Sequence, residues 1–294
     1  MFKVVFPQDK KIFKEIVFLS YPVVLSNISR VLMSIFDVAM VGRLGSEALA
    51  ATGMGGMLVW APMSMALGIR TAVQTVSSRR LGQRKEEESS KAFHNGLIMA
   101  TVFAFPVTLI GWVYADQIVP LFLEDQTTIV LAVEYTSIAF ISLLFSVYSF
   151  VFVGFYTGVE KTKIHMTVTI ISNIINLYLN AALIYGSEGI DLFFREVLPS
   201  LSFLKVAWGW TYFPAMGVKG AALATLVASV WMAAHYCFYL FSKEIKTRFN
   251  VFSFSFNKEM MRKQLQLAIP MGVQECIIAF GWTFFLKVVG IIGV

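Results

Sequence analysis

The chain has 294 residues, of which 57% are hydrophobic, 15% aromatic and only 14% charged, with a formal net charge of +6. Soluble domains carry roughly 25% charged residues, so this composition excludes a soluble globular protein and predicts an all-α integral membrane protein. The two cysteines and three histidines are too few and too scattered for a four-thiolate metal cluster or an HExxH zinc site, and we expect no metal and no cofactor.

Seven apolar stretches are long enough to cross the ~30 Å hydrocarbon core of a bilayer. They lie near residues 16–42, 53–76, 94–115, 133–157, 164–186, 216–241 and 265–292. Seven spans place the two chain ends on opposite sides of the membrane.

The distribution of Lys and Arg predicts which side is cytoplasmic. Three of the 24 lie within spans, and most of the others lie on the side of the amino terminus. The opposite side has only Arg43, Arg195, Lys205 and Lys219. Because cytoplasmic loops carry the basic excess, we expect a cytoplasmic amino terminus in the cell (inner) membrane. The positive charge then reflects topology and attraction to anionic lipid, and gives no support for a nucleic-acid partner.

The first and seventh spans share a sparse internal repeat. Four pairs of identical residues align 248 positions apart: Pro22 with Pro270, Val41 with Val289, Gly42 with Gly290, and Gly45 with Gly293. Because one repeat unit has six spans, an even number, both copies enter the membrane from the same side, and the repeat is parallel, with its axis along the membrane normal. We therefore expect residues 1–250 to form an amino-terminal six-helix lobe and residues 251–294 to begin a second, incomplete lobe. On this interpretation the chain is truncated and lacks five further spans.

Charged residues in the first span indicate a polar helix face. Arg30 and Asp37, with Ser26, Asn27 and Ser34, occupy an arc of about 100°. A charge at the bilayer centre costs several kcal/mol unless it faces a bundle interior or a wet cavity. We therefore expect this face to line a cavity, with Asp37 a few residues inside the outer end.

The fifth span carries a second polar stripe, within about 60° of the helix surface. It consists of Thr169, Asn173, Asn176 and Asn180. One interpretation is interhelical hydrogen bonding, worth about 0.6 kcal/mol per contact. The other is the wall of a polar cavity, which the stripe favours when combined with an intramembrane carboxylate.

Three further features concern helix packing. Pro22 removes a backbone hydrogen bond from the first span and predicts a hinge. Small residues at 217–225 predict close packing of the sixth span, with the fifth as its neighbour. Arg70, inside the second span, either extends towards the cytoplasmic surface or has a function.

The motifs FDVAMVGRLGSEALAATG after the first span, SSRRLGQ after the second and GVKGAALATLVAS in the sixth resemble the multidrug and toxic compound extrusion (MATE) family. Members of that family have twelve helices in two six-helix lobes and export cationic amphipathic compounds by antiport with protons or sodium. The resemblance implies a multidrug efflux transporter rather than an enzyme, and one that requires a carboxy-terminal lobe.

The resemblance also implies roles for individual residues. Asp37 matches the acidic residue that couples transport to the ion, and Pro22 matches the proline at which the first helix bends. Asn176 and Thr225 match residues of the cation site. Asn180 departs from the family pattern, which often has Asp there, and the loss of a second carboxylate favours protons over sodium as the coupling ion.

Two other functions stay open at this point. Arg30 and Arg70 are compatible with a lipid-linked precursor flippase, and Lys287 with a seven-helix receptor or retinal protein. The external segment 187–215, rich in aromatic and basic residues, suggests an interfacial helix to which we assign no function.

Overall fold

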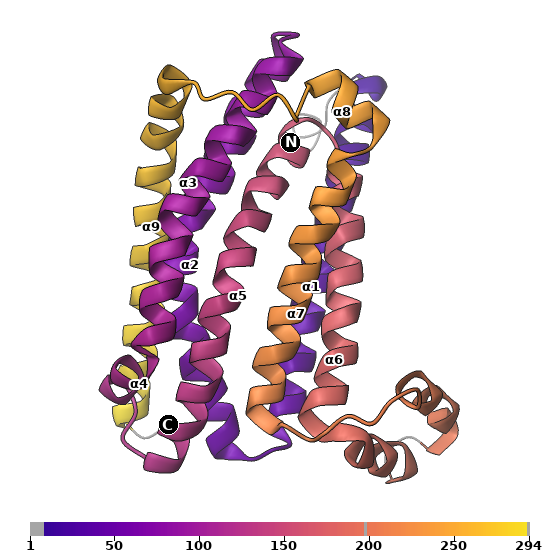
Figure 1. The fold of residues 1–294 in the computed structure, drawn as a ribbon, viewed down its shortest axis with the longest axis vertical. Coiled ribbons are helices and arrows are strands. Elements are labelled where there is room, and N and C mark those ends of the chain that lie inside the picture. Colours follow the sequence, from indigo (N-terminus) through magenta and orange to yellow (C-terminus); the bar gives the residue numbers. More distant parts are fainter. Residues whose placement is uncertain (1–8, 197–198, 293–294) are drawn as a thin grey trace, which may run out of the picture.

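The computed structural model describes residues 9–196 and 199–292 (Figure 1). The basic segment before residue 9, Gly293 of the predicted repeat and the side chain of Lys287 lie outside the described part. Within the described ranges the chain forms helices and no β-strand. The elements are α1 Lys10–Gly42, α2 Ser46–Gly82, α3 Glu86–Val113, α4 Ala115–Ile118, η2 Val119–Leu121, α5 Gln126–Gly158, α6 Thr162–Glu196, η3 Pro199–Trp208, α7 Gly217–Leu240, α8 Lys243–Phe249 and α9 Lys258–Ile292.

Seven of these helices are long and apolar enough to cross a membrane: α1, α2, α3, α5, α6 as far as Leu192, α7, and α9 as far as Trp282. The predicted all-α membrane class and the seven spans are therefore confirmed. The helices extend beyond the predicted stretches because hydropathy marks only the part of a helix that matches the hydrocarbon core.

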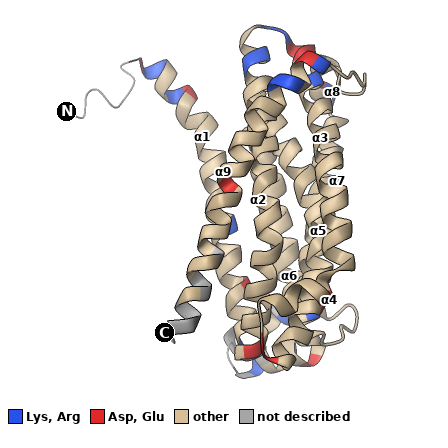
Figure 2. Cartoon of the chain, turned by 90° about the vertical axis from the view of Figure 1, so that its left-hand side faces the viewer, with Lys and Arg blue, Asp and Glu red and all other residues tan. Residues whose placement is uncertain are grey.

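The long helices run side by side, with α5 at the centre of the bundle (Figure 1). α5 packs against α2, α3 and α7, and contributes Leu143, Val147 and Phe155, all fully buried, to the core. α1 packs mainly against α6, and α9 mainly against α2. Both α1 and α9 lie on one side of the bundle (Figure 2).

Asp125 caps α5 and so fixes where this central helix begins. Its Oδ2 accepts hydrogen bonds from Thr127 Oγ1 (2.5 Å) and from the backbone N–H of Thr128 (2.8 Å). These hydrogen bonds, with Thr127 contributing most, lower the pKa of Asp125 to about 2. The cap therefore stays ionised at neutral pH and favours the helix start.

Glycines allow two pairs of helices to approach closely. A Cβ atom on Gly220 of α7 would lie 2.2 Å from the carbonyl oxygen of Leu183 on α6, which confirms the predicted packing of these two helices. A Cβ atom on Gly68 of α2 would lie 2.2 Å from the carbonyl oxygen of Ala268 on α9. The crossing of α9 over α2 thus depends on a bare backbone at Gly68.

α6 breaks at Gly186, which has a φ of 68°. Beyond this residue the rest of α6 and η3 project sideways from the end of the bundle (Figure 1). η3 contacts α6 through Trp208. The Nε1 of Trp208 donates to the carbonyl oxygen of Tyr178 (3.0 Å), and its ring stacks on that tyrosine. Its sideways course fits the expected interfacial position, which stays a prediction.

Candidate functional site

The polar stripes of α1 and α6 meet at Asp37. Asn180 Nδ2 donates to Asp37 Oδ1 at 2.5 Å and to Asn176 Oδ1 at 3.2 Å. Asn176 and Asn180 are 6% and 2% exposed, while Asp37 is half-buried. The α1 carboxylate and two α6 amides, which the sequence placed on separate helix faces, therefore form one cluster.

The cluster leaves one polar atom without a partner. Asn180 Oδ1 is buried and accepts no hydrogen bond in the described structure. A buried acceptor left in this way costs about 1–3 kcal/mol. An ionised Asp37 requires the NH₂ group of Asn180 to face it, whereas a protonated Asp37 can donate to the carbonyl oxygen if the amide turns over. Asn180 can therefore hydrogen-bond to Asp37 whether the carboxyl group is ionised or protonated.

Tyr135 of α5 lies near this cluster, close enough to Asp37 for an electrostatic interaction between the two side chains. The sequence contains no signal that brings Tyr135 to this place. It lies in an apolar span whose neighbours the periodicity does not identify.

A second set of polar contacts follows α6 towards its amino-terminal end. Asn173 Nδ2 donates to Ser29 Oγ of α1 at 2.8 Å. His165 Nδ1 lies 2.8 Å from Tyr236 Oη of α7 and 3.2 Å from Thr169 Oγ1. His165 and Tyr236 were missed by the sequence reasoning, although His165 stands one turn before Thr169 and so extends the predicted stripe.

Asn173, His165, Thr169 and Tyr236 line a cavity of about 180 Å³ between α1, α2, α5, α6 and α7, which we call the polar cavity. Its lining comprises Ser26, Asn27, Arg30, Trp60, Met63, Arg70, Ser146, Ser149, Phe150, Val153, His165, Thr169, Asn173, Met232 and Tyr236. Asn27 and Arg30 precede Asp37 by ten and seven residues on α1, so the cavity lies about 10–15 Å from the Asp37 cluster along the helix.

Not every predicted site residue joins these two places. Ser34 is exposed on α1 and does not line the cavity. Thr225 is half-buried on α7, where its hydroxyl donates to the carbonyl oxygen of Ala221 (3.0 Å). Pro22 is buried inside a continuous α1, and Ser26 Oγ donates to its carbonyl oxygen (2.7 Å). The roles assigned to these residues stay predictions.

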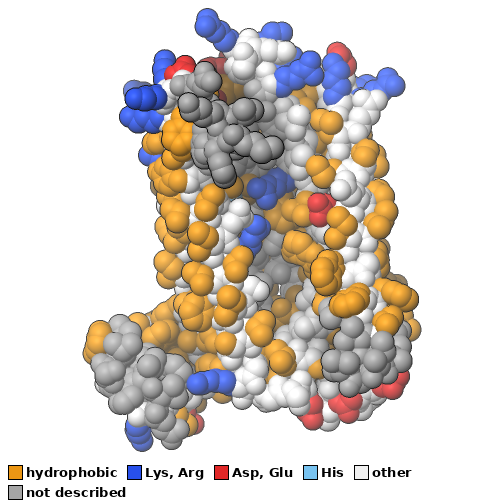
Figure 3. All heavy atoms as spheres, turned by 180° about the vertical axis from the view of Figure 1, so that it is seen from behind, with side chains coloured by type: hydrophobic (Ala, Val, Ile, Leu, Met, Phe, Trp, Pro, Cys, Tyr) orange, Lys and Arg blue, Asp and Glu red, His pale blue; other side chains and the backbone are white. Residues whose placement is uncertain are grey.

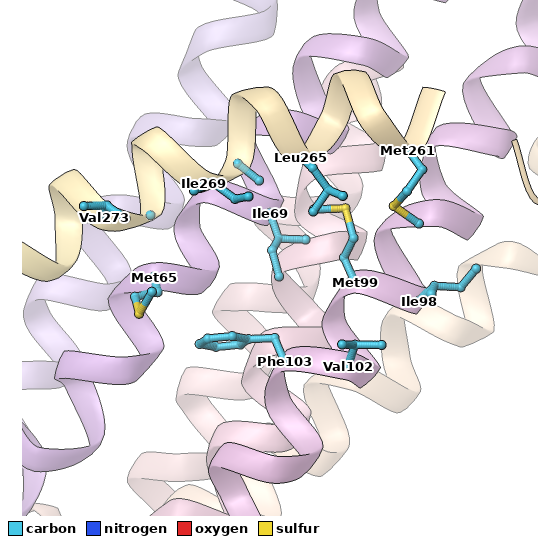
Figure 4. Close-up of a pocket in the computed structure, with 12 residues that line it drawn as sticks. Met65, Ile69, Ile98, Met99, Val102, Phe103, Met261, Leu265, Ile269 and Val273 are labelled. Atoms are coloured by element: carbon cyan, nitrogen blue, oxygen red, sulfur yellow. The ribbon is translucent and has the colours of Figure 1, made fainter. Parts of the chain in front are cut away.

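A larger pocket of about 410 Å³ lies between α2, α3 and α9 (Figure 4). Hydrophobic side chains such as Ile69, Phe103 and Leu265 point into it. All the residues that line it are apolar, so it has no side chain to orient a polar or charged ligand. We therefore assign the candidate site to the Asp37 cluster and the polar cavity.

The fold defines a multi-pass helical membrane protein with an intramembrane carboxylate held by amides. Residues 22–182, more than half of the chain, match the MatE family model. The chain therefore belongs to the MATE family of transporters, which excludes an enzyme and the receptor or retinal-protein alternative.

Relatives and solved structures agree with this membership. The chain is 25% identical over 260 residues to the probable multidrug resistance protein NorM of Rhodopseudomonas palustris, covering 88% of this chain and 50% of the relative. It is 26% identical over 268 residues to the protein of the same name from Bacillus anthracis, covering 88% and 52%. The crystal structure of a MATE transporter in the straight conformation shares the fold, with a TM-score of 0.76 and 23% identity, covering 95% and 56%. The chain thus spans about half the length of the curated relatives it matches.

Proposed function

We propose that this chain forms the first lobe of a multidrug antiporter that exports cationic amphipathic compounds in exchange for protons. The names of its relatives and its family membership support multidrug efflux. The observation that carries the coupling role is the hydrogen bond from the buried Asn180 to Asp37. A carboxy-terminal lobe completes the substrate path in this proposal.

The proposed cycle begins with an ionised Asp37 that accepts from the Asn180 amide. Asp37 lies five residues before the end of α1 at Gly42, about 8 Å along the helix, so a proton reaches it from the outer side. Protonation removes the charge, turns the amide over and changes how α1 is held on α6. α1 then bends at Pro22, and the substrate path that the two lobes complete together closes as the cationic substrate leaves. Asn180 supplies a neutral amide where a second carboxylate would favour sodium.

The distribution of charge supports a cytoplasmic amino terminus. Lys and Arg gather mainly at the end of the bundle that contains α8 (Figure 2). Ion pairs such as Arg248 with Glu86 (2.6 Å) and Arg80 with Glu88 (3.1 Å) order this end. Because basic residues are retained on the cytoplasmic side, we propose that this end faces the cytoplasm.

Dye transport tests the proposal. The protein is expressed from its own gene in cells that lack their native efflux pumps, and efflux of the cationic dye ethidium is driven by a proton gradient. Asp37→Asn cannot ionise, so we expect efflux to fall by about tenfold or more, within the usual range of coupling between two sites. Asp191→Asn, which changes an exposed carboxylate, serves as the control.

Unchanged proton-driven efflux in Asp37→Asn would rule the coupling role out. Absence of dye efflux from the unmodified protein, with accumulation of a lipid-linked oligosaccharide in a deletion strain, would favour the flippase alternative instead.

A further inference from the structure

The polar cavity carries positive charge that no carboxylate balances. Arg30 and Arg70 line it, and none of its described lining residues is Asp or Glu. The two guanidinium groups interact electrostatically with each other and with His165. Figure 3 shows basic side chains halfway along a largely hydrophobic face, with an acidic side chain to one side of them. Such an arrangement favours an anion over a cation.

Arg70 has no partner that would account for its position. It is half-buried on α2, and in the described part of the chain it makes neither a hydrogen bond nor an ion pair. It stands six residues before the end of the predicted second span at residue 76, about 9 Å along the helix, and nine residues before the exposed Arg79. A guanidinium at this depth is costly unless an anion pairs with it.

Arg30 approaches the same space from α1. One of its Nη2 donors binds Asn27 Oδ1 at 2.6 Å, which leaves its other N–H groups available. Asn27 therefore orients the guanidinium group of Arg30 without neutralising its charge. Glu275 on α9 forms no ion pair with either arginine among the described residues.

The remaining cavity wall selects the kind of anion. Trp60, Phe150, Met63 and Met232 present flat or flexible apolar surface. Such surface suits an apolar aromatic body and is of little use to a free phosphate or sulfate ion. The volume of about 180 Å³ limits the ligand to a small aromatic acid.

We propose that Arg30 and Arg70 form an anion-binding site that takes the carboxylate of a small aromatic acid. Guanidinium forks match the two oxygens of a carboxylate, and the surrounding apolar groups hold the ring. The site is separate from Asp37 and does not depend on the proposed proton coupling. The range of ligands proposed for this lobe then includes amphipathic compounds with an acidic group as well as cations.

Equilibrium dialysis tests this site on the purified full chain in an uncharged detergent. The probe is 2-naphthoate, and its neutral amide, 2-naphthamide, controls for apolar partition. We expect tighter binding of the acid, weakened about tenfold or more by Arg70→Gln because one charged partner is lost. Arg79→Gln, an exposed arginine on the same helix, is expected to bind 2-naphthoate like the unmodified chain.

Two further measurements keep the result unambiguous. Arg70→Lys retains a point charge, so we expect its affinity for 2-naphthoate to lie between those of the unmodified chain and Arg70→Gln. If Arg70→Gln aggregates, Arg30→Gln replaces it, and we expect the same loss of affinity. Asp37→Asn is expected to leave 2-naphthoate binding unchanged, which separates this site from the coupling residue.

Equal binding of 2-naphthoate by Arg79→Gln and by both folded glutamine variants would overturn the proposal. So would equal affinity for the acid and its amide. Displacement of 2-naphthoate by dodecyl phosphate but not by benzoate would assign the arginines to a lipid headgroup and overturn it as well.

Discussion

At the scale of single residues, the structure holds a carboxylate in the membrane by giving it a neutral partner. Asn180 donates to Asp37 and to Asn176, and its own carbonyl oxygen is buried without a donor. A positively charged partner would hold Asp37 ionised, because an opposite charge favours the charged form. The amide permits both protonation states, and this is the property that a proton-coupling residue needs.

The identity of residue 180 therefore predicts ion selectivity. Asn180→Asp places a second carboxylate next to Asp37, and two carboxylates this close repel unless a cation or a proton lies between them. We expect this variant to bind sodium, measured as saturable ²²Na⁺ binding to the purified protein. Asn173→Asp makes the same change at an amide that contacts Ser29 instead, and we expect no sodium binding there. Absence of sodium binding in Asn180→Asp would contradict this account of selectivity.

Helical periodicity predicted some residues of the site and not others. It placed Asp37 on one face of the first span and Asn176 and Asn180 on one face of the fifth, because a 3.6-residue repeat depends on sequence alone. It did not identify Tyr135 or Tyr236, because a tyrosine within an apolar span does not show which neighbouring helix its hydroxyl group will face. Their contribution depends on which helices pack together, and that is a property of the whole bundle.

At the scale of helices, bare backbone at glycine decides how closely α9 crosses α2. A Cβ atom on Gly68 would lie 2.2 Å from the carbonyl oxygen of Ala268, and one on Gly272 would lie 2.6 Å from that of Met65. Backbone atoms cannot move aside as a flexible side chain can. The crossing therefore tolerates no larger residue at either position.

Gly68→Val is expected to destabilise the protein by about 1–3 kcal/mol, the usual cost of overpacking. The measurement is thermal unfolding of the purified protein in detergent. Gly56→Val on the same helix is the matched control, because a Cβ atom on Gly56 meets nothing within 4 Å. A lower unfolding temperature for Gly68→Val than for Gly56→Val agrees with the close crossing, and equal temperatures would contradict it.

Hydropathy predicted the seven long helices but not the short ones. α4 and α8 have only four and seven residues, too few to show a membrane-length apolar run. α8 is held by contacts from other elements, such as the ion pair of Arg248 with Glu86 on α3. Such elements depend on tertiary contacts rather than on local sequence.

At the scale of the whole molecule, the segment between α8 and α9 is fixed to the first six spans. His94 Nε2 lies 2.7 Å from the carbonyl oxygen of Val251, and Asn95 Nδ2 donates to that of Asn257 at 2.9 Å. Gln264 of α9 donates to the carbonyl oxygen of Ala92 at 2.9 Å. The first helix of the predicted second lobe is thus held against α2 and α3, while the lobe boundary near residue 250 stays a prediction.

α1 and α9 lie on one side of the bundle (Figure 2), and α1 also lines the polar cavity. The central claim is that water, rather than lipid, reaches the Asp37 side of α1. Ser34 lies on this side of the helix. Leu32 lies at the same depth but about 160° around the helix, and is 50% exposed.

Cysteine labelling measures the water accessibility of this side of α1 most directly. Ser34→Cys and Leu32→Cys are made in a chain in which the native Cys237 and Cys276 are replaced by serine, and a membrane-impermeant maleimide is added from outside the cell. A cysteine on α8 replacing Lys246 checks sidedness, because it should react only after the membrane is opened. We predict rapid labelling at residue 34 and little at residue 32. Labelling at residue 32 with protection of residue 34 would place Asp37 against lipid and contradict the proposed export mechanism.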